Sequence, residues 1–246
     1  MKVRVVTYNV HKCRGMDGRT SIARISQVLR ETGGDVIALQ EIMGNQADAI
    51  STELALPFVI GENRRHLGEA YGNIVLSRLR IRDWHNYDLS VAGREQRGCL
   101  RADLELGDTG ALLHVFNVHL GTSFGERRHQ GRRLLGPELL TDGELENPRI
   151  VLGDFNEWTS GLATQLLRGH MQSAECRWRS YPGLLPLLHL DHMYYDEELR
   201  LERFTLHRTR KALMASDHLP LIGDFEVAES APQNGEMLLQ KRNGSK

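Results

Sequence analysis

Short runs of β-branched and apolar residues alternate with polar turns along most of the chain. Residues 3–10 and 36–39 have the composition of buried strands. Between them, apolar residues recur on one face of a predicted helix, with Thr20 or Ser21 as its N-cap and Gly33 at its end. Strand, helix and strand in this order predict a crossover between two parallel strands of a covered sheet.

The rest of the chain repeats the alternation of strands and helices. We expect strands at residues 73–76, 82–87, 99–106, 111–119, 149–152, 187–194, 203–207 and 219–227, and helices at residues 46–54, 126–140 and 159–167, the last capped by Thr159 or Ser160. The turn residues 107–110 predict an antiparallel hairpin. Strands of both directions with few helices indicate an α/β (α+β) protein with two packed sheets and helices outside.

Composition indicates a single globular domain. The chain has 246 residues, of which 40% are hydrophobic and 26% are charged. No Pro/Gly/Ser-rich linker divides the strand segments, so we expect one domain over residues 1–228. Residues 229–246 are polar and contain Gly and Asn, a composition typical of a disordered tail.

Charge and cysteine content narrow the expected partners and compartment. The formal net charge is −1, which argues against a dedicated polynucleotide binder without excluding a local basic patch. The three cysteines, Cys13, Cys99 and Cys176, have no metal-ligand spacing and fit reduced thiols. The first residues lack a secretory signal and no apolar run reaches the ~20 residues that span a bilayer. We therefore expect a cytoplasmic protein without stable membrane insertion or a required protein partner.

Side chains that can bind metal or transfer protons recur at strand ends. They are Asn9, His11, Glu41, Asn117, His119, Asp154, Asn156, Asp191, His192, Asp217 and His218. A rigid strand end presents catalytic groups well. A phosphate ester is anionic, so its hydrolysis requires charge neutralisation and a positioned water. Mg²⁺ or Mn²⁺ held by a few carboxylates supplies both, and a histidine fixed by an aspartate stabilises the phosphate. Each residue alone is compatible with a turn, a cap or a solvated loop, and for Glu41 alone the loop is the better interpretation.

Seven strings occur in order between residues 7 and 220. They are Thr7-Tyr8-Asn9-Val10, Leu39-Gln40-Glu41, Gly72-Asn73-Ile74-Val75-Leu76-Ser77-Arg78, Asn117-Val118-His119-Leu120, Gly153-Asp154-Phe155-Asn156, Leu190-Asp191-His192-Met193 and Ser216-Asp217-His218-Leu219-Pro220. Together they resemble the endonuclease/exonuclease/phosphatase superfamily of DNase I-like metal-dependent phosphoesterases. This superfamily includes abasic-site endonucleases, neutral sphingomyelinases and inositol-polyphosphate 5-phosphatases. The resemblance implies a DNase I-like four-layered α/β sandwich, in which two mixed sheets pack face to face between helices.

The resemblance also implies roles for individual residues. The metal ligands would be Glu41 as the main ligand, Asn9 beside it and Asp217 as an additional one. Among the catalytic residues, Asp154 would orient or deprotonate the attacking water, and Asn156 would hold the phosphate. His218 would stabilise the transition state, with Asp191 to orient it, and His119 would lie near the phosphate.

Substrate-binding candidates are less specific. His11 stands where some superfamily members have an acidic residue, a departure that would alter a second metal position. Arg128, in the densest cationic stretch, and its neighbour Arg127 would pair with phosphate or simply lie on a solvated helix face. Arg97 has the same two interpretations, facing either the substrate or the solvent at a strand start. The chain has no long insertion for embracing DNA and no apolar membrane-docking hairpin.

The sequence therefore predicts a divalent-metal-dependent phosphoesterase that attacks a phosphodiester or phosphomonoester in line with water. Its substrate would be a phospholipid head group, a nucleic acid or a small phosphodiester, and the near-neutral charge slightly favours a substrate other than a polynucleotide. A nuclease acting on DNA or RNA is one alternative. A catalytically silent, metal-binding interaction scaffold is another, although silent relatives would be free to lose the carboxylates and histidines that this chain keeps.

Overall fold

The computed structural model describes residues 1–107, 110–143, 145, 148–158, 161–174 and 178–227. Its strands are β1 (Lys2–Asn9), β2 (Val36–Met43), β3 (Phe58–His66), β4 (Glu69–Ser77), β5 (Ile81–Asp88), β6 (Gly98–Glu105), β7 (Leu112–His119), β8 (Arg149–Asp154), β9 (Gln172–Ser173), β10 (Asp191–Tyr195), β11 (Leu199–Leu206) and β12 (Leu221–Val227). Its helices are η1 (His11–Cys13), α1 (Ile22–Thr32), α2 (Gly44–Leu54), α3 (Phe124–Leu134), α4 (Leu162–Arg168) and α5 (Ala212–Ala215). The predicted tail 229–246, the caps Thr159 and Ser160, and Cys176 lie outside the described residues.

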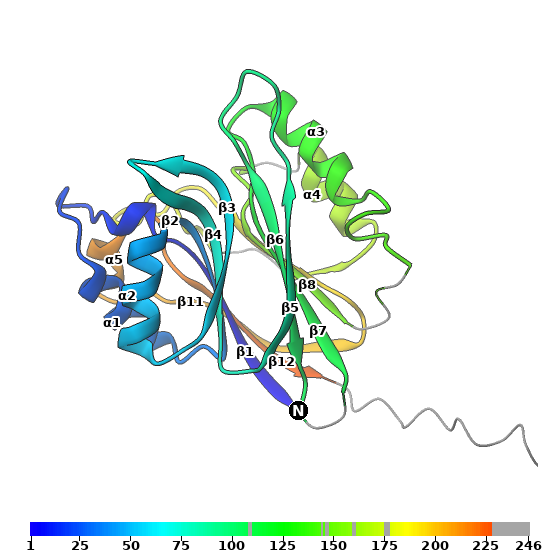
Figure 1. The fold of residues 1–246 in the computed structure, drawn as a ribbon, viewed down its shortest axis with the longest axis horizontal. Helices are drawn as coiled ribbons and strands as arrows, with labels where there is room; N and C mark the ends of the chain where they lie inside the picture. Colours follow the sequence, from blue (N-terminus) through cyan, green and yellow to red (C-terminus); the bar gives the residue numbers. More distant parts are fainter. Residues whose placement is uncertain (108–109, 144, 146–147, 159–160, 175–177, 228–246) are drawn as a thin grey trace, which may run out of the picture.

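Two mixed six-stranded sheets form the middle of the molecule (Figure 1). Their strand orders are β11-β12-β1-β2-β4-β3 and β5-β6-β7-β8-β10-β9. The β1–β2 and β7–β8 pairs are parallel, and the other pairs within the two sheets are antiparallel. Helices lie on the outer faces, with α1 and α2 beside one sheet and α3 and α4 beside the other (Figure 1). This arrangement confirms the predicted four-layered sandwich.

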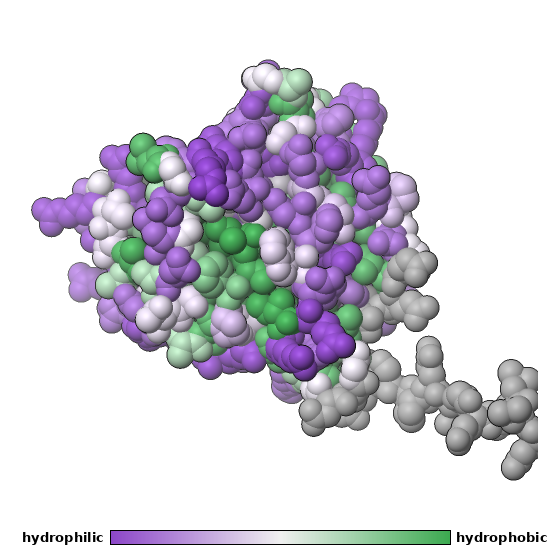
Figure 2. Space-filling view, in the orientation of Figure 1, coloured by the Kyte–Doolittle hydropathy of each residue, from purple (hydrophilic) through white to green (hydrophobic). Residues whose placement is uncertain are grey.

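Three apolar cores correspond to the spaces between these layers. One lies between the sheets and includes Val5, Leu100 and Phe225. The other two lie under α1, α2 and α5, and under α3 and α4. Figure 2 shows apolar surface between the two sheets on the viewed face, surrounded by hydrophilic side chains. None of the described helices combines the length and the apolar character that a membrane crossing requires.

Local signals explain the first crossover. The Ser21 hydroxyl accepts a hydrogen bond from the Arg24 amide, and so caps α1 as expected for a serine at this position. Gly33 ends the helix with φ 63°, a left-handed conformation that glycine adopts without strain. The chain then enters β2, which pairs in parallel with β1 from Val5 to Asn9. The predicted crossover is therefore confirmed.

Two sequence predictions about the elements are wrong, and one strand was not predicted. The helix predicted at 126–140 ends at Leu134, shortly before Gly136-Pro137, because proline lacks an amide hydrogen and cannot continue the helical ladder. The strand predicted at 187–194 begins only at Asp191, because the preceding segment folds back and pairs Leu188 with Tyr181 in an isolated bridge. Strand β3 was not predicted, because its polar second half has no regular alternation.

The topology brings the chemically important residues to one edge of the sandwich. Asn9, His119 and Asp154 are the last residues of β1, β7 and β8. Asp191 opens β10, which runs antiparallel to β8 and pairs Asp191 with Asp154. His218 precedes β12, which runs antiparallel to β1. Carboxyl ends of some strands therefore meet amino ends of their antiparallel neighbours at this edge.

Gly153 allows β7 and β8 to approach closely beside the site. It has φ 138°, and a Cβ atom there would lie 1.9 Å from the Val118 carbonyl oxygen. We expect Gly153→Ala to reduce the free energy of unfolding by at least about 2 kcal/mol, because both the clash and the backbone conformation oppose a side chain. Thermal or urea unfolding measures this loss.

Gly125→Ala is the matched control. Gly125 lies in α3 and a Cβ there meets no atom within 4 Å, so alanine should leave stability unchanged or raise it by up to about 1 kcal/mol. Equal stabilities of the two variants would contradict the role assigned to Gly153.

Candidate active site

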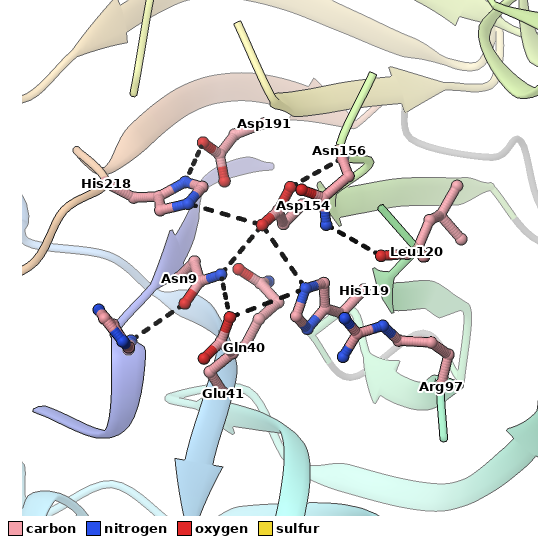
Figure 3. A network of polar contacts seen from close by, with 12 residues as sticks. Asn9, Gln40, Glu41, Arg97, His119, Leu120, Asp154, Asn156, Asp191 and His218 are labelled. Carbon is pink, nitrogen blue, oxygen red and sulfur yellow. Dashed lines mark hydrogen bonds and ion pairs between the residues drawn. The ribbon is translucent and has the colours of Figure 1, made fainter. Parts of the chain in front are cut away.

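His218 is held between two buried carboxylates. Its Nδ1 lies 2.8 Å from Asp191 Oδ2, and its Nε2 lies 3.6 Å from Asp154 Oδ2 (Figure 3). The Ser180 hydroxyl donates to the same Asp191 oxygen, and the Tyr181 ring packs against the imidazole with 5.0 Å between centroids. These contacts fix the orientation of the ring.

Glu41 lies on the other side of Asp154. The Asn9 amide nitrogen lies 3.2 Å from Glu41 Oε1 and 3.0 Å from Asp154 Oδ2, so it bridges the two carboxylates (Figure 3). The Asn9 oxygen accepts a hydrogen bond from the His11 amide. In this arrangement Asn9 positions both carboxylates, and acting as a ligand would require its oxygen to turn toward the site.

The backbone at Glu41 departs from regular strand geometry. Glu41 has φ 56°, and the β2–β4 register shifts between Leu39 and Ile42. A bulge of this kind redirects a side chain and is frequent next to active sites. A non-glycine residue in the left-handed region costs of order 1–3 kcal/mol, which the surrounding sheet must offset. The bulge turns the Glu41 carboxylate toward Asn9 and His119.

The two histidines of the site differ in protonation. Burial lowers the pKa of His218, but the charges of Asp191 and Asp154 outweigh it and raise the pKa to about 10, which makes the ring cationic at neutral pH. Burial lowers the pKa of His119 to about 4, and the nearby Arg97 guanidinium acts in the same direction. The neutral His119 ring places its Nε2 3.7 Å from Asp154 and 3.9 Å from Glu41.

The two central carboxylates also differ. Burial raises the pKa of Asp154, a shift that favours proton acceptance from water at neutral pH. Burial also acts to raise the pKa of Glu41, but His119, the Asn9 amide and the Lys12 ammonium together lower it to about 2. Glu41 is therefore the permanently ionised oxygen donor of the site.

Asn156 and Asp217 complete the predicted set. The Asn156 backbone amide donates to Asp154 Oδ1 at 2.8 Å, and its side chain donates to the Leu120 carbonyl oxygen at 3.0 Å (Figure 3). Asp217 Oδ2 lies 3.3 Å from His11 Nδ1, so the histidine that stands in place of an acidic residue pairs with a predicted metal ligand.

The three predicted arginines have different surroundings. The Arg97 guanidinium lies beside the His119 ring, next to the site (Figure 3). Arg127 is buried in α3 and donates to the carbonyl oxygens of Gly121 and Thr122, which gives it structural partners in the loop before the helix. Arg128 is exposed on α3 and makes no hydrogen bond or ion pair with the part of the chain that the structure describes. Its substrate role stays a prediction without a contact to support it.

The donor set fits a hard divalent cation. Among the described residues, no group of three His, Cys, Asp or Glu side chains is arranged to enclose a metal ion. Mg²⁺ does not require such a cage, because it keeps several waters and is usually bound through one or two carboxylates. The ionised Glu41, whose side chain is 21% exposed, and Asp217, at 26%, offer oxygen ligands that solvent and substrate can reach. The residues thus match Mg²⁺ or Mn²⁺ chemistry, and not a closed zinc site.

Asn117 has a structural role that the sequence did not reveal. Its amide nitrogen donates to the carbonyl oxygens of Leu39 and Ile74, and its oxygen accepts from Gln40 at 2.7 Å. Asn73 in turn donates to the Asn117 carbonyl oxygen. This fully buried network joins β7 of one sheet to β2 and β4 of the other, directly below the site. The only sequence signal was its position in the string that ends at His119.

The sandwich with its polar site at one edge has the DNase I-like architecture. The chain belongs to the Endonuclease/Exonuclease/phosphatase family, which it matches over residues 6–218. Members of this family hydrolyse phosphate esters, as endonucleases, exonucleases or phosphatases.

Individual relatives cover almost the whole chain. The uncharacterized protein YbhP of Escherichia coli K12 is 30% identical over 252 residues, covering 91% of this chain and 96% of its own. A functionally unknown protein from Enterococcus faecalis V583 has a similar structure, with a TM-score of 0.79 at 18% identity and coverage of 92% and 100%. The mannosyl-6-phosphatase Bt3783 of Bacteroides thetaiotaomicron has a TM-score of 0.73 at 16% identity and coverage of 91% and 99%.

The Asn117 network should contribute to the stability of the fold. Asn117→Ala removes the side-chain donor of two buried carbonyl oxygens and one of the acceptors of the Gln40 amide, which keeps its bond to Thr7. Each buried group left unsatisfied costs about 1–3 kcal/mol. We expect the free energy of unfolding to fall by about 3 kcal/mol or more, as measured by chemical denaturation. Asn45→Ala, at an exposed position of α2, is the control and should change stability by less than about 0.5 kcal/mol. A mild effect at Asn117 would show that the network does not hold the sheets together.

Proposed function

We propose that this protein is a divalent-metal-dependent phosphoesterase that uses water to cleave a small phosphate ester. One observation carries the proposal. The buried Asp154 carboxylate lies within 3.7 Å of a cationic histidine, a neutral histidine and an amide, next to the ionised Glu41. A carboxylate of raised pKa beside a fixed positive charge suits the attack of water on an anionic phosphate.

Each residue has a defined part in the proposed reaction. Asp154 orients the attacking water and accepts its proton as the water oxygen bonds to phosphorus. The ester bond opposite breaks with its electron pair going to the departing oxygen, which takes a proton from solvent and leaves as the alcohol. His218, kept cationic by Asp191, stabilises the negative charge that accumulates on the phosphate oxygens. Asn156, whose backbone amide donates to Asp154, would hold a phosphate oxygen with its side chain. His119, neutral and buried, donates or accepts one hydrogen bond without adding charge.

The cofactor is a divalent cation, Mg²⁺ or Mn²⁺, which Glu41 would hold together with Asp217 and Asn9. When bound, such an ion neutralises phosphate charge and the charge of the departing oxygen.

The favoured substrate class is a small phosphodiester or phosphomonoester. The net charge of −1 does not favour a long polyanion, which usually requires a basic face. The mannosyl-6-phosphatase of similar fold cleaves, by its name, a phosphomonoester of a small sugar, which supports the same class here. A phospholipid head group and a nucleic acid are the alternative substrates, and a silent scaffold is the alternative to an enzyme.

Turnover of model esters tests the proposal. We expect the wild type to hydrolyse bis-p-nitrophenyl phosphate or p-nitrophenyl phosphate with Mg²⁺ or Mn²⁺ and to lose this activity in EDTA. Glu41→Ala and His218→Ala should each reduce the rate by at least about 10³-fold, because each removes a charge that acts on the transition state. The release of p-nitrophenolate measures both effects, and the preferred ester distinguishes a diesterase from a monoesterase.

Glu198→Ala, at an exposed position of the β10–β11 turn, is the control for losing a carboxylate and should retain wild-type activity. Thermal unfolding establishes that every variant is folded. Full activity in folded Glu41→Ala would refute the assignment of this residue.

Metal binding tests the proposed cation site independently of turnover. We expect Mn²⁺ to bind wild type in the micromolar-to-millimolar range, and Glu41→Ala to weaken binding at least about tenfold. Electron paramagnetic resonance of free Mn²⁺ measures this without any substrate. Unchanged binding in Glu41→Ala would place the cation elsewhere. Metal binding without turnover of any ester class would favour the scaffold.

A further inference from the structure

A group of charged side chains beside the site has no part in the proposed reaction. Glu95 binds two arginines at once, with its Oε1 2.5 Å from Arg64 Nη1 and its Oε2 2.9 Å from Arg97 Nη2. One carboxylate cannot neutralise two guanidinium groups, so this trio of Arg64, Glu95 and Arg97 carries a net charge of +1.

A β-bulge directs Arg64 toward the site. The β3–β4 register shifts between Glu62 and Arg64, opposite Gly72 and Tyr71 of β4. At the same place a Cβ atom on Gly72 would lie 1.9 Å from the Gly61 carbonyl oxygen, so the strands approach more closely there than a side chain permits. The bulge turns the Arg64 guanidinium over the Tyr71 ring, with 4.6 Å between its Cζ and the ring centroid.

The trio is continuous with the reaction centre at both of its ends. On the Arg64 side, the Tyr71 ring also contacts Lys12, whose Nζ lies 3.5 Å from Glu41 Oε2. On the other side, Arg97 lies beside the His119 ring (Figure 3). A substrate phosphate bound between Glu41 and His119 would therefore have these cations as its next neighbours.

Both arginines retain unused donors. The Nε atoms of Arg64 and Arg97 are buried and have no hydrogen-bond partner among the described residues. Arg97 is the more enclosed of the two, with its side chain 6% exposed. A buried donor without a partner costs about 1–3 kcal/mol, a cost that a bound anion would remove. Guanidinium groups pair with phosphate through two parallel hydrogen bonds, so phosphate matches this geometry and charge.

We propose that Arg64 and Arg97, held by Glu95, bind a second phosphate group of the substrate beside the phosphate that is cleaved. The preferred substrate is then a small molecule with two neighbouring phosphates, in place of a simple ester of a neutral alcohol. This inference rests on the proposed phosphoesterase function and specifies its substrate. Glu95 occupies a donor of each guanidinium group and offsets part of their charge, so it competes with the phosphate that they would bind.

Anion binding without catalysis tests the inference. In EDTA, inorganic phosphate and pyrophosphate are titrated separately into the protein by calorimetry, so that neither turnover nor a metal complex contributes. We expect wild type to bind pyrophosphate at least about tenfold more tightly than phosphate, a difference of about 1.4 kcal/mol. Arg64→Gln should reduce this preference to about threefold or less, because it removes one charged donor group.

Two further variants test whether the pyrophosphate preference depends on the trio. Arg65→Gln alters the next residue, whose side chain is 69% exposed and donates to the Gly68 carbonyl oxygen, and it should retain the wild-type preference. Glu95→Gln removes the competing carboxylate and should tighten pyrophosphate binding by about threefold or more, a gain that a damaged fold does not produce.

Equal affinities for the two anions in wild type, or an undiminished preference in Arg64→Gln, would overturn the inference and leave the trio as an ion-pair network. Weaker pyrophosphate binding by Glu95→Gln would do the same. Ester hydrolysis by wild type reports separately on the proposed function. Turnover without pyrophosphate preference defeats only the second phosphate position, whereas pyrophosphate preference without turnover defeats only the phosphoesterase.

Discussion

The buried amide of Asn117 is the contact that fixes the two sheets relative to each other. It joins β7 to the backbone of β2 and β4 through the carbonyl oxygens of Leu39 and Ile74, and to the Gln40 side chain. Glu41 directly follows Gln40 in one sheet, and His119 follows Asn117 by two residues in the other. A purely apolar contact between the sheets would tolerate sliding, whereas directional hydrogen bonds do not. The distance between Glu41 and His119 is therefore determined by a group that takes no part in chemistry.

The site contains two histidines in different protonation states. His218 has a carboxylate on each side and is cationic, whereas His119 lies beside Arg97 and is neutral. Asp154 lies between the two rings, so it is attracted to the cationic His218 and has the neutral His119 Nε2 3.7 Å from its Oδ2. One fixed cation beside one buried carboxylate can stabilise an anionic transition state without reorganisation, because the charges are already oriented before the substrate binds.

Much of the fold and of the reaction centre could be predicted, because the relevant signals are local. The Ser21 cap, the Gly33 stop and the β-branched strands predict the first crossover from adjacent residues alone. Strand β3 could not be predicted, since an edge strand tolerates polar residues on both faces and its Glu62–His66 half has no period-2 pattern. Arg64, Glu95 and Arg97 come together only through the packing of separate strands. Asn117 looked like a ligand candidate, and only its burial between two sheets reveals a structural role. The roles of the remaining site residues stay predictions.

The two bulges that flank Tyr71 and Gly72 differ in what surrounds them. The bulge at Glu41 lies in β2, which has neighbours on both sides, whereas the bulge at Arg64 lies in β3, the last strand of its sheet. Inserting or deleting a residue in β3 would shift Arg64 and disturb only the pairing of β3 with β4. A change confined to β3 could therefore alter which substrates related chains bind while the hydrolytic centre stays the same. Specificity and reactivity would then evolve independently on one fold.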